Sequence, residues 1–187
     1  MRTALLLAAA LATAPADTTS TAAARPEAAL APATRAAPPP CPPELFRIAR
    51  STNANQVVYA ARLARGGGLD KADPLSAEWH MLAEDGHREG LNFLENLLAY
   101  GFSVDPAPEG DGFQVILKAK KDRPVHLTLR NGCPAALVRI AGRPGVLKRI
   151  FVQTGAGGVI PTVAWADLEG EDPENGDSLF ERVYPKN

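Results

Sequence analysis

Three side chains that could bind a metal ion lie close together in the stretch SAEWHMLAEDGHREG, residues 76–90. If this stretch forms one continuous helix, His80, Glu84 and His87 follow at i, i+4 and i+7 and share a face. Imidazole and carboxylate groups are usual zinc ligands, and a bound zinc could activate water for hydrolysis. Gly86 weakens this hypothesis, because glycine costs about 1 kcal/mol in a helix interior and favours a turn.

The same residues can also be assigned to a strand. Asp73-Pro74 is typical of a helix start, with an aspartate cap followed by proline at the first helical position. A strand over residues 75–83 would instead place Trp79 on one face and His80 on the other. In that strand His80 and Glu84 would lie about 13 Å apart, too far to share one ion. The local pattern does not decide between helix and strand.

Polar residues also gather around the first turn that the sequence predicts. Arg47, Arg50, Asn53 and Asn55 occur in the stretch LFRIARSTNANQVVYA. A guanidinium presents a planar pair of donors that suits a carboxylate or phosphate, so this group could bind an anion. Turn-forming asparagines and solvent-exposed arginines explain the same pattern without a ligand.

Lys148 is the last candidate for a ligand contact. Together with Arg149 it interrupts an apolar run, and neighbouring residues of a strand point to opposite faces, so one of the two cations would face inward. A buried cation needs a partner, for which Glu181 is a candidate. The alternative is an edge strand whose exposed lysine blocks pairing with another sheet.

The rest of the chain offers little catalytic chemistry. The serines lack the G-x-S-x-G context of a hydrolase nucleophile. The glycine-rich stretch 154–158 leads into an expected strand, whereas a phosphate-binding loop would lead into a helix. We therefore predict no catalytic residue and no cofactor.

Alternation of apolar and polar residues with a period of two predicts strands through most of the chain from Glu44 onward. Phe113, Val115 and Leu117 share one strand face, and residues 125–129 repeat the pattern. Further strands are expected at 45–50, 56–63, 135–140, 146–153, 162–168 and 179–184. Glycine- and asparagine-rich turns separate them. About eight or nine short strands predict a mainly β fold, an antiparallel sandwich or barrel.

One amphipathic helix is expected beside the strands. Leu91, Leu94 and Leu98 follow at i, i+3 and i+7, a stripe that predicts a helix with its leucines in the core. Asp85 would cap its start, and Gly101 would end it in the left-handed conformation. Such a helix would pack on the sheet or close one end of a barrel.

The chain is expected to have three parts. Residues 1–16 combine Arg2, an apolar run too short to span a bilayer and a small-x-small motif, which is the pattern of a signal peptide. Residues 17–43 are mostly Ala, Pro, Thr and Ser and predict a disordered tether. Residues 44–187 are expected to form a single β-rich domain. The protein would then be exported, either periplasmic or secreted.

The two cysteines, Cys41 and Cys133, suit this location. Exported proteins meet an oxidising compartment, in which an even number of cysteines favours a disulfide. Cys133 follows a turn expected at Asn131-Gly132. A bridge would close a loop of roughly 90 residues and stabilise the fold by on the order of 4 kcal/mol. Two free thiols remain the alternative.

Charge and hydropathy argue against two classes of partner. The 20 Lys and Arg nearly balance the 21 Asp and Glu, for a net charge of −1. No basic surface for nucleic acid is therefore indicated. No apolar segment of the chain reaches the length that a membrane-spanning helix needs.

Several short motifs follow one another in an order that is similar to a known family. They are LFRIARSTNANQVVYAARL, LDKADPLSAEWHMLAEDG, AYGF after the leucine-rich segment, LKRIFVQT, PTVAWADLEGEDPENGD and ERVYP. From Glu44 to Pro185 the chain resembles the bacterial domain of unknown function 4833. The resemblance implies a strand before Trp79 and does not require histidine at position 80 or 87. It implies no activity.

The sequence favours an exported, non-catalytic β-rich domain with a binding or structural role in the cell envelope. One alternative is a barrel that holds a small apolar ligand, with the helix as a lid or plug. The other is a secreted metal-dependent hydrolase that uses His80, Glu84 and His87.

Overall fold

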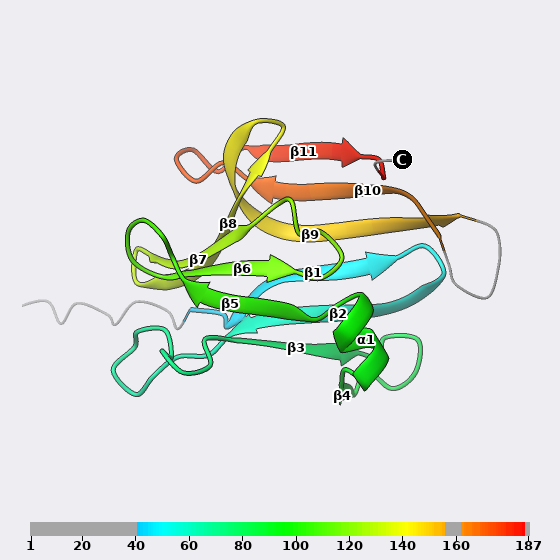
Figure 1. Cartoon of the computed structure of the whole chain (residues 1–187), viewed down its shortest axis with the longest axis horizontal. Helices are drawn as coiled ribbons and strands as arrows, with labels where there is room; N and C mark the ends of the chain where they lie inside the picture. The colour runs from blue at the N-terminus through cyan, green and yellow to red at the C-terminus, as the bar shows by residue number, and fades with distance from the viewer. Residues whose placement is uncertain (1–40, 156–161, 186–187) are drawn as a thin grey trace, which may run out of the picture. The chain divides into compact units, whose positions relative to one another are not determined.

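Figure 1 shows the chain in a computed structural model that describes residues 41–155 and 162–185. These residues contain eleven strands and one short helix. In chain order the elements are β1 (Glu44–Arg50), β2 (Asn53–Ala61), β3 (Leu75–His80), β4 (Arg88–Gly90), α1 (Phe93–Leu98), β5 (Phe102–Pro106), β6 (Phe113–Leu117), β7 (Val125–Arg130), β8 (Cys133–Ile140), β9 (Arg143–Gly155), β10 (Thr162–Glu171) and β11 (Ser178–Val183). The expected signal peptide, and all of the expected tether except residues 41–43, lie outside the described residues.

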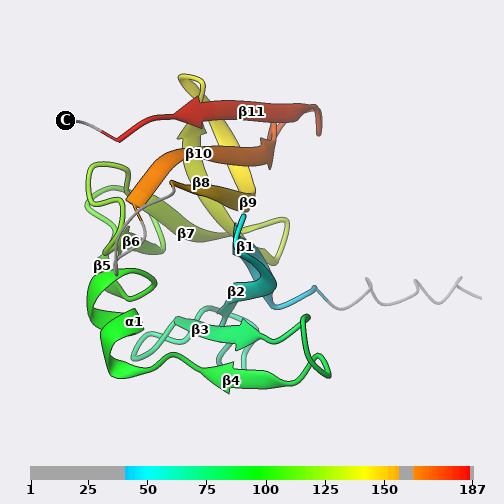
Figure 2. The ribbon, with the colours of Figure 1, turned by 90° about the vertical axis from the view of Figure 1, so that its right-hand side faces the viewer.

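The strands form one sheet. Its main path follows the order β4-β3-β2-β1-β9-β8-β7-β6-β5, while β10 pairs with β9 and β11 pairs with β10. Neighbouring strands are antiparallel except β1 and β9, which run parallel. The sheet curls into a half-barrel, which brings the ring of Tyr59 on β2 to 6.1 Å from that of Phe102 on β5 (Figures 1 and 2). The predicted mainly β fold with one helix is confirmed.

β9 joins the two halves of the sheet. Along one edge its first residues pair with β8, whereas Arg149 to Val152 pair with β1. Its other edge pairs with β10 from Val146 to Gly155. A single strand of 13 residues therefore connects the N-terminal strands with both C-terminal ones.

Two tight hairpins set the register of β7, β8 and β9. Asn131 and Gly132 have φ angles of 51° and 81°, and Ala141 and Gly142 have φ angles of 49° and 80°. Two central residues with positive φ match a type I′ turn, whose twist suits antiparallel strands. The first turn was expected from its Asn-Gly pair. The second turn has Ala141 as its first central residue. The sequence does not indicate this position, because alanine rarely adopts a positive φ.

The interior of the domain is packed with its own side chains. Phe46 on β1 and Tyr59 on β2 stack with their ring centroids 4.4 Å apart. The Tyr59 hydroxyl donates a hydrogen bond of 2.6 Å to the backbone oxygen of Tyr100, and burial raises the pKa of Tyr59 well above its usual range. The other large side chains under 2% exposed are Leu127, Ile140, Leu147, Val57, Val58 and Val115. This packing argues against a hollow barrel that holds an apolar ligand.

The stretch that opened the sequence analysis forms the end of β3, an irregular connection and β4, so its helical interpretation is wrong. β3 pairs with β2 along its whole length, and Leu75 and Trp79 are buried. Pairing and burial outweigh the local preference of Asp73-Pro74 for a helix start, since tertiary contacts routinely override intrinsic propensity. The strand that the family resemblance implies before Trp79 is confirmed.

The helix begins later than expected. α1 is capped by Asn92 and not by Asp85: the Asn92 Oδ1 accepts from the Glu95 backbone N–H at 2.9 Å. The Glu95 Oε2 accepts from the Asn92 backbone N–H at 3.0 Å, which completes a capping box. Gly101 is not in the left-handed conformation that was expected. Glycine is needed at position 101 because the backbone of Asn96 lies very close: a Cβ there would be 1.6 Å from the Asn96 backbone oxygen.

Leu94 and Leu98 of the expected stripe do not belong to the core, which corrects another expectation, whereas Leu91, which precedes α1, is partly buried against the core. Glu95 turns toward the sheet and accepts a hydrogen bond of 3.0 Å from the Trp79 Nε1. The apolar residues of α1 consequently face solvent, and Phe93, Leu94, Leu97 and Leu98 are 77%, 62%, 53% and 68% exposed. Within the described ranges no helix is long and apolar enough to cross a bilayer.

The expected disulfide is present. Cys41 and Cys133 are bonded, with their Cα atoms 5.3 Å apart, and they are 92 positions apart in the sequence. The bond connects the residues just before β1 to the first residue of β8. It therefore fixes the N-terminal end of the described fold to the β7–β8 hairpin.

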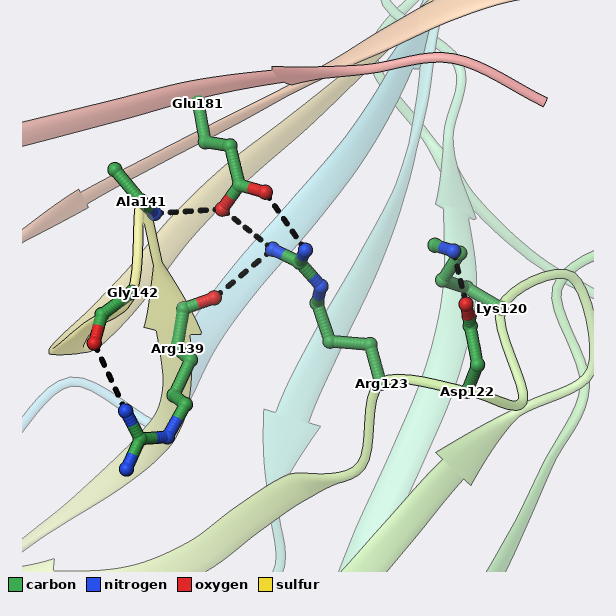
Figure 3. Close-up of polar contacts among 7 residues, drawn as sticks. All are labelled: Lys120, Asp122, Arg123, Arg139, Ala141, Gly142 and Glu181. Carbon is green, nitrogen blue, oxygen red and sulfur yellow. Dashed lines mark hydrogen bonds and ion pairs between the residues drawn. The ribbon is translucent and has the colours of Figure 1, made fainter. Parts of the chain in front are cut away.

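A cluster of polar contacts attaches β11 to the hairpins of the half-barrel (Figure 3). Arg123, between β6 and β7, donates to both carboxylate oxygens of Glu181 on β11 at 2.6 and 2.7 Å. The same guanidinium donates to the backbone oxygen of Arg139 at 2.9 Å. Glu181 also accepts from the backbone N–H of Ala141 at 2.6 Å, which supports the positive φ of that alanine.

We expect this cluster to make stability depend on pH. The two hydrogen bonds from Arg123 hold the pKa of Glu181 below its usual range. The contribution of the Arg123–Glu181 ion pair to folding stability is therefore complete above the unfolded-state pKa of the carboxyl group. It is lost as the pH falls through the lower, folded-state pKa. Glu181→Gln should lower the free energy of unfolding at pH 7 by about 1–3 kcal/mol. Urea unfolding at pH 7 and pH 3 should show this difference shrinking in acid.

Glu174→Gln is the matched control, because Glu174 is an exposed glutamate in the turn before β11. It should unfold like the wild type at both pH values. A Glu181→Gln variant whose deficit is equally large at pH 3 would contradict the assignment of the effect to the Arg123 ion pair.

Candidate functional site

One cleft brings together three of the five residues that the sequence marked as ligand contacts. It has a volume of about 240 Å³ and lies where the end of β1 meets β2, β3, β4 and the start of α1. Arg50, Asn53 and Asn55 line it. The other lining residues are Trp79, Met81, Glu89, Gly90, Asn92 and Glu95. We call this hollow the Arg50 cleft.

The guanidinium of Arg50 lies over two aromatic rings. Its guanidinium carbon lies 5.0 Å from the ring centroid of Trp79 and 5.7 Å from that of Tyr100. Both distances lie within the range of a cation–π contact. The Arg50 Nε is buried and has no hydrogen-bond partner in the protein. Since buried donors are nearly always paired, the Arg50 guanidinium, which lines the cleft, has donor capacity that the described residues do not use.

The walls of the cleft are fixed by contacts among themselves. The rings of Trp79 and Tyr100 meet edge to face with their centroids 5.1 Å apart. The carboxylate of Glu95 joins the Trp79 indole to the cap of α1 through the two hydrogen bonds given above. Burial raises the pKa of Tyr100, although the positive charge of Arg50 opposes this shift. The site is thus arranged before any ligand arrives.

The charges that line the cleft have both signs. Arg50 supplies a cation, and Glu89 and Glu95 supply carboxylates. Asn55 uses its side-chain oxygen to accept from the Ala83 backbone N–H at 2.8 Å, and Asn92 uses its own for the helix cap. The amide groups of both residues therefore have a defined orientation, with nitrogen as the donor that remains for other partners.

Two of the expected ligand contacts lie elsewhere. Arg47 pairs with Glu44 at 2.8 Å on the same strand and does not line the cleft. Lys148 pairs with Glu171 at 3.2 Å, and both side chains are half exposed. β9 lies between other strands, so the expected edge-strand role of Lys148 is wrong. The expected inward partner, Glu181, is occupied by Arg123.

The residues of the expected metal site do not form a ligand set. His80 ends β3, and Glu84 and His87 follow in the irregular connection to β4. His87 bonds to Asp85, and that hydrogen bond raises the pKa of the imidazole. Nowhere in the described part of the chain do three His, Cys, Asp or Glu side chains come together in a way that could hold a metal. The shared helix face on which the hypothesis depended does not exist.

Six of the nine lining residues escaped the sequence analysis, as did Tyr100, which contacts Arg50. Trp79 was considered there only for the face of a strand, and Tyr100 only as part of a family motif, since their contact with Arg50 depends on the curl of the sheet. Asn92 and Glu95 could have been found, because the spacing Asn-x-x-Glu before an apolar run is that of a capping box.

Comparison with known proteins now places the chain in a family. Residues 46–182 match the family model described as domain of unknown function (DUF4833). The match covers most of the chain, and the protein belongs to this family. No curated protein and no solved structure matches it.

Proposed function

We propose that this protein is an exported binding domain, not an enzyme, and that the Arg50 cleft binds a small polar ligand through a carboxylate. The observation that carries the proposal is the Arg50 guanidinium in the lining of the cleft, held against two aromatic rings and with its buried Nε unpaired. A carboxylate accepts well from such a fixed donor, because charge-assisted hydrogen bonds are the stronger ones.

The lining favours a ligand that also carries a positive group. Glu89 and Glu95 would repel a simple anion, but they would attract an ammonium group on a ligand whose carboxylate contacts Arg50. Ligand pockets usually begin near 300 Å³, so a cleft of about 240 Å³ suits a ligand of amino-acid or dipeptide size. We therefore propose that the ligand is a zwitterion whose carboxylate and ammonium groups lie close to each other.

Export is supported by two independent features. The N-terminal sequence has the three-part pattern of a signal peptide, which lies outside the described residues. The disulfide between Cys41 and Cys133 is of the kind that persists in oxidising compartments such as the periplasm. A binding role in the cell envelope is consistent with both.

The proposal is tested with three related peptides followed by NMR. Ala-Ala has both charges, N-acetyl-Ala-Ala lacks the ammonium group, and Ala-Ala amide lacks the carboxylate. The protein has two tryptophans, so its indole N–H region reports on Trp79 in the cleft and on Trp165 outside it. Ala-Ala should shift the Trp79 signal and leave Trp165 unchanged, and the amide should bind at least tenfold more weakly.

Arg50→Gln should weaken the binding of Ala-Ala by about 10- to 100-fold, which corresponds to losing a hydrogen bond between charged groups. Arg47→Gln is the matched control, because Arg47 lies on the same strand but outside the cleft. If Arg50→Gln binds like the wild type, or if the amide binds as well as Ala-Ala, the cleft does not recognise a carboxylate.

A further inference from the structure

The apolar face of α1 is unpartnered in the structure. Phe93, Leu94, Leu97 and Leu98 are all more than half exposed and come from a single helix of six residues. Together they expose on the order of 400 Å², the size of patch that usually has a function on a soluble domain. We call these four side chains the α1 apolar face. The Arg50 cleft does not explain it, because none of the four lines that cleft.

This surface projects outward. The helix lies at one edge of the domain, between β5 and β6 on one side and β3 and β4 on the other (Figure 2). None of the four side chains lines the Arg50 cleft or the second cleft, which Pro108 and His126 line. A peptide or helix from a protein partner usually enters a groove, whereas a projecting apolar surface suits a partner that deforms around it.

The charge around the face favours a membrane surface. The only charged residue of α1 is Glu95, and its carboxylate is directed to Trp79 and the helix cap. Lys118 lies next to the end of the helical segment, because its backbone N–H donates to the Gly101 oxygen at 2.8 Å. Lys118 and Lys121 are both exposed in the connection between β6 and β7. An exposed apolar helix face with a lysine close to its end is the kind of surface that binds anionic lipid at the interface.

A second copy of the chain fits the same face less well. Two such faces in contact would bury less than the roughly 1,000 Å² in total that a specific interface needs. A lipid surface has no such requirement, because each apolar side chain that enters the boundary of the headgroups contributes independently.

We propose that the α1 apolar face docks the domain on a lipid membrane. Phe93, Leu94, Leu97 and Leu98 enter the boundary between headgroups and acyl chains, and Lys118 and Lys121 contact anionic headgroups. The docking is weak and reversible, since so small a surface resembles a single lipid chain in strength. It would hold the Arg50 cleft close to the membrane, because both use the segment that begins at Asn92.

The test uses fluorescence quenching, which reports on one position. The full chain carrying Phe93→Trp is mixed with vesicles of brominated phosphatidylcholine, with or without 30% phosphatidylglycerol. Bromine quenches only a tryptophan that reaches the acyl chains, so the N-terminal segment does not contribute to the signal from position 93. We expect added quenching in the Phe93→Trp chain relative to the wild type, and stronger quenching with phosphatidylglycerol.

Phe180→Trp is the matched control, because Phe180 is 56% exposed on β11, outside the α1 apolar face. It should show no added quenching. Introducing Leu94→Gln and Leu98→Gln into the Phe93→Trp chain should reduce vesicle affinity at least tenfold while circular dichroism stays unchanged. Lys118→Gln with Lys121→Gln should remove only the gain from phosphatidylglycerol.

Two outcomes would overturn the proposal. The first is a Phe93→Trp chain that neither kind of vesicle quenches, or that is quenched to the same extent after Leu94→Gln and Leu98→Gln are introduced. The second is sedimentation equilibrium that shows a dimer of the wild type which Leu94→Gln and Leu98→Gln dissociate. That result would assign the α1 apolar face to a second copy of the chain.

Discussion

Replacing both cysteines by serine should lower the free energy of unfolding by about 4–5 kcal/mol, as expected in the chain-entropy model for a bond that closes a loop of this length. Cys41 and Cys133 are 92 positions apart, so the bond restricts most of the unfolded chain. Domains of this size are stable by only about 5–15 kcal/mol, and the loss is therefore a large fraction of the total. Urea unfolding at neutral pH measures it directly.

Reduction of the wild type provides an independent check. Unfolding in the presence of a strong thiol reductant should match that of the Cys41→Ser, Cys133→Ser double variant, and the reductant should not affect the double variant. If the two proteins unfold at the same urea concentration under oxidising conditions, the bond contributes nothing and loop closure does not explain its presence. Each single variant should lose as much stability as the double, because either change breaks the bond.

The strand pattern of the domain was largely predictable because burial on one side of a sheet imposes a period of two. β6 and β7 were found through the alternating residues of 113–117 and 125–129, and the Asn131-Gly132 turn through its chemistry. β4 and β5 were not expected. β4 has three exposed residues, REG, and β5 has the sequence FSVDP, whose proline and aspartate disfavour a strand.

The parallel pairing of β1 with β9 could not be predicted. The two strands are about 100 positions apart in the sequence, and nothing in a local pattern specifies which distant strand lies beside which. The curl of the sheet follows from such pairings. It is this curl that brings Trp79 and Tyr100 against Arg50, so the sequence could name Arg50 as a candidate without indicating what surrounds it.

The helix shows why a stripe of leucines does not by itself locate the core. The spacing of Leu91, Leu94 and Leu98 matches a core-facing helix, but periodicity defines a face and does not say what covers that face. In the structure Glu95 faces the sheet, where it accepts a hydrogen bond from Trp79, and the apolar side chains of α1 face solvent. The periodicity does not indicate this contact.

Tyr59→Ala should cost about 3–5 kcal/mol, because it removes a large buried ring and leaves a cavity. Tyr59 is fully buried and stacks on Phe46. Tyr59→Phe keeps the ring but leaves the backbone oxygen of Tyr100 without its donor, at a cost of about 1–3 kcal/mol. Urea unfolding of the two variants separates the contribution of packing from that of the hydrogen bond.

The hydrogen bond also connects the core to the Arg50 cleft, since Tyr100 provides one of the two rings beside the guanidinium. Tyr59→Phe should therefore shift the indole signal of Trp79, which contacts Tyr100 edge to face, and leave that of Trp165 in place. Tyr184→Phe is the control, because Tyr184 is 66% exposed and its hydroxyl should contribute less than about 0.5 kcal/mol. If Tyr59→Phe loses stability but leaves the Trp79 signal unchanged, the bond supports the fold alone. If it changes both, the shape of the cleft depends on a hydroxyl buried in the core.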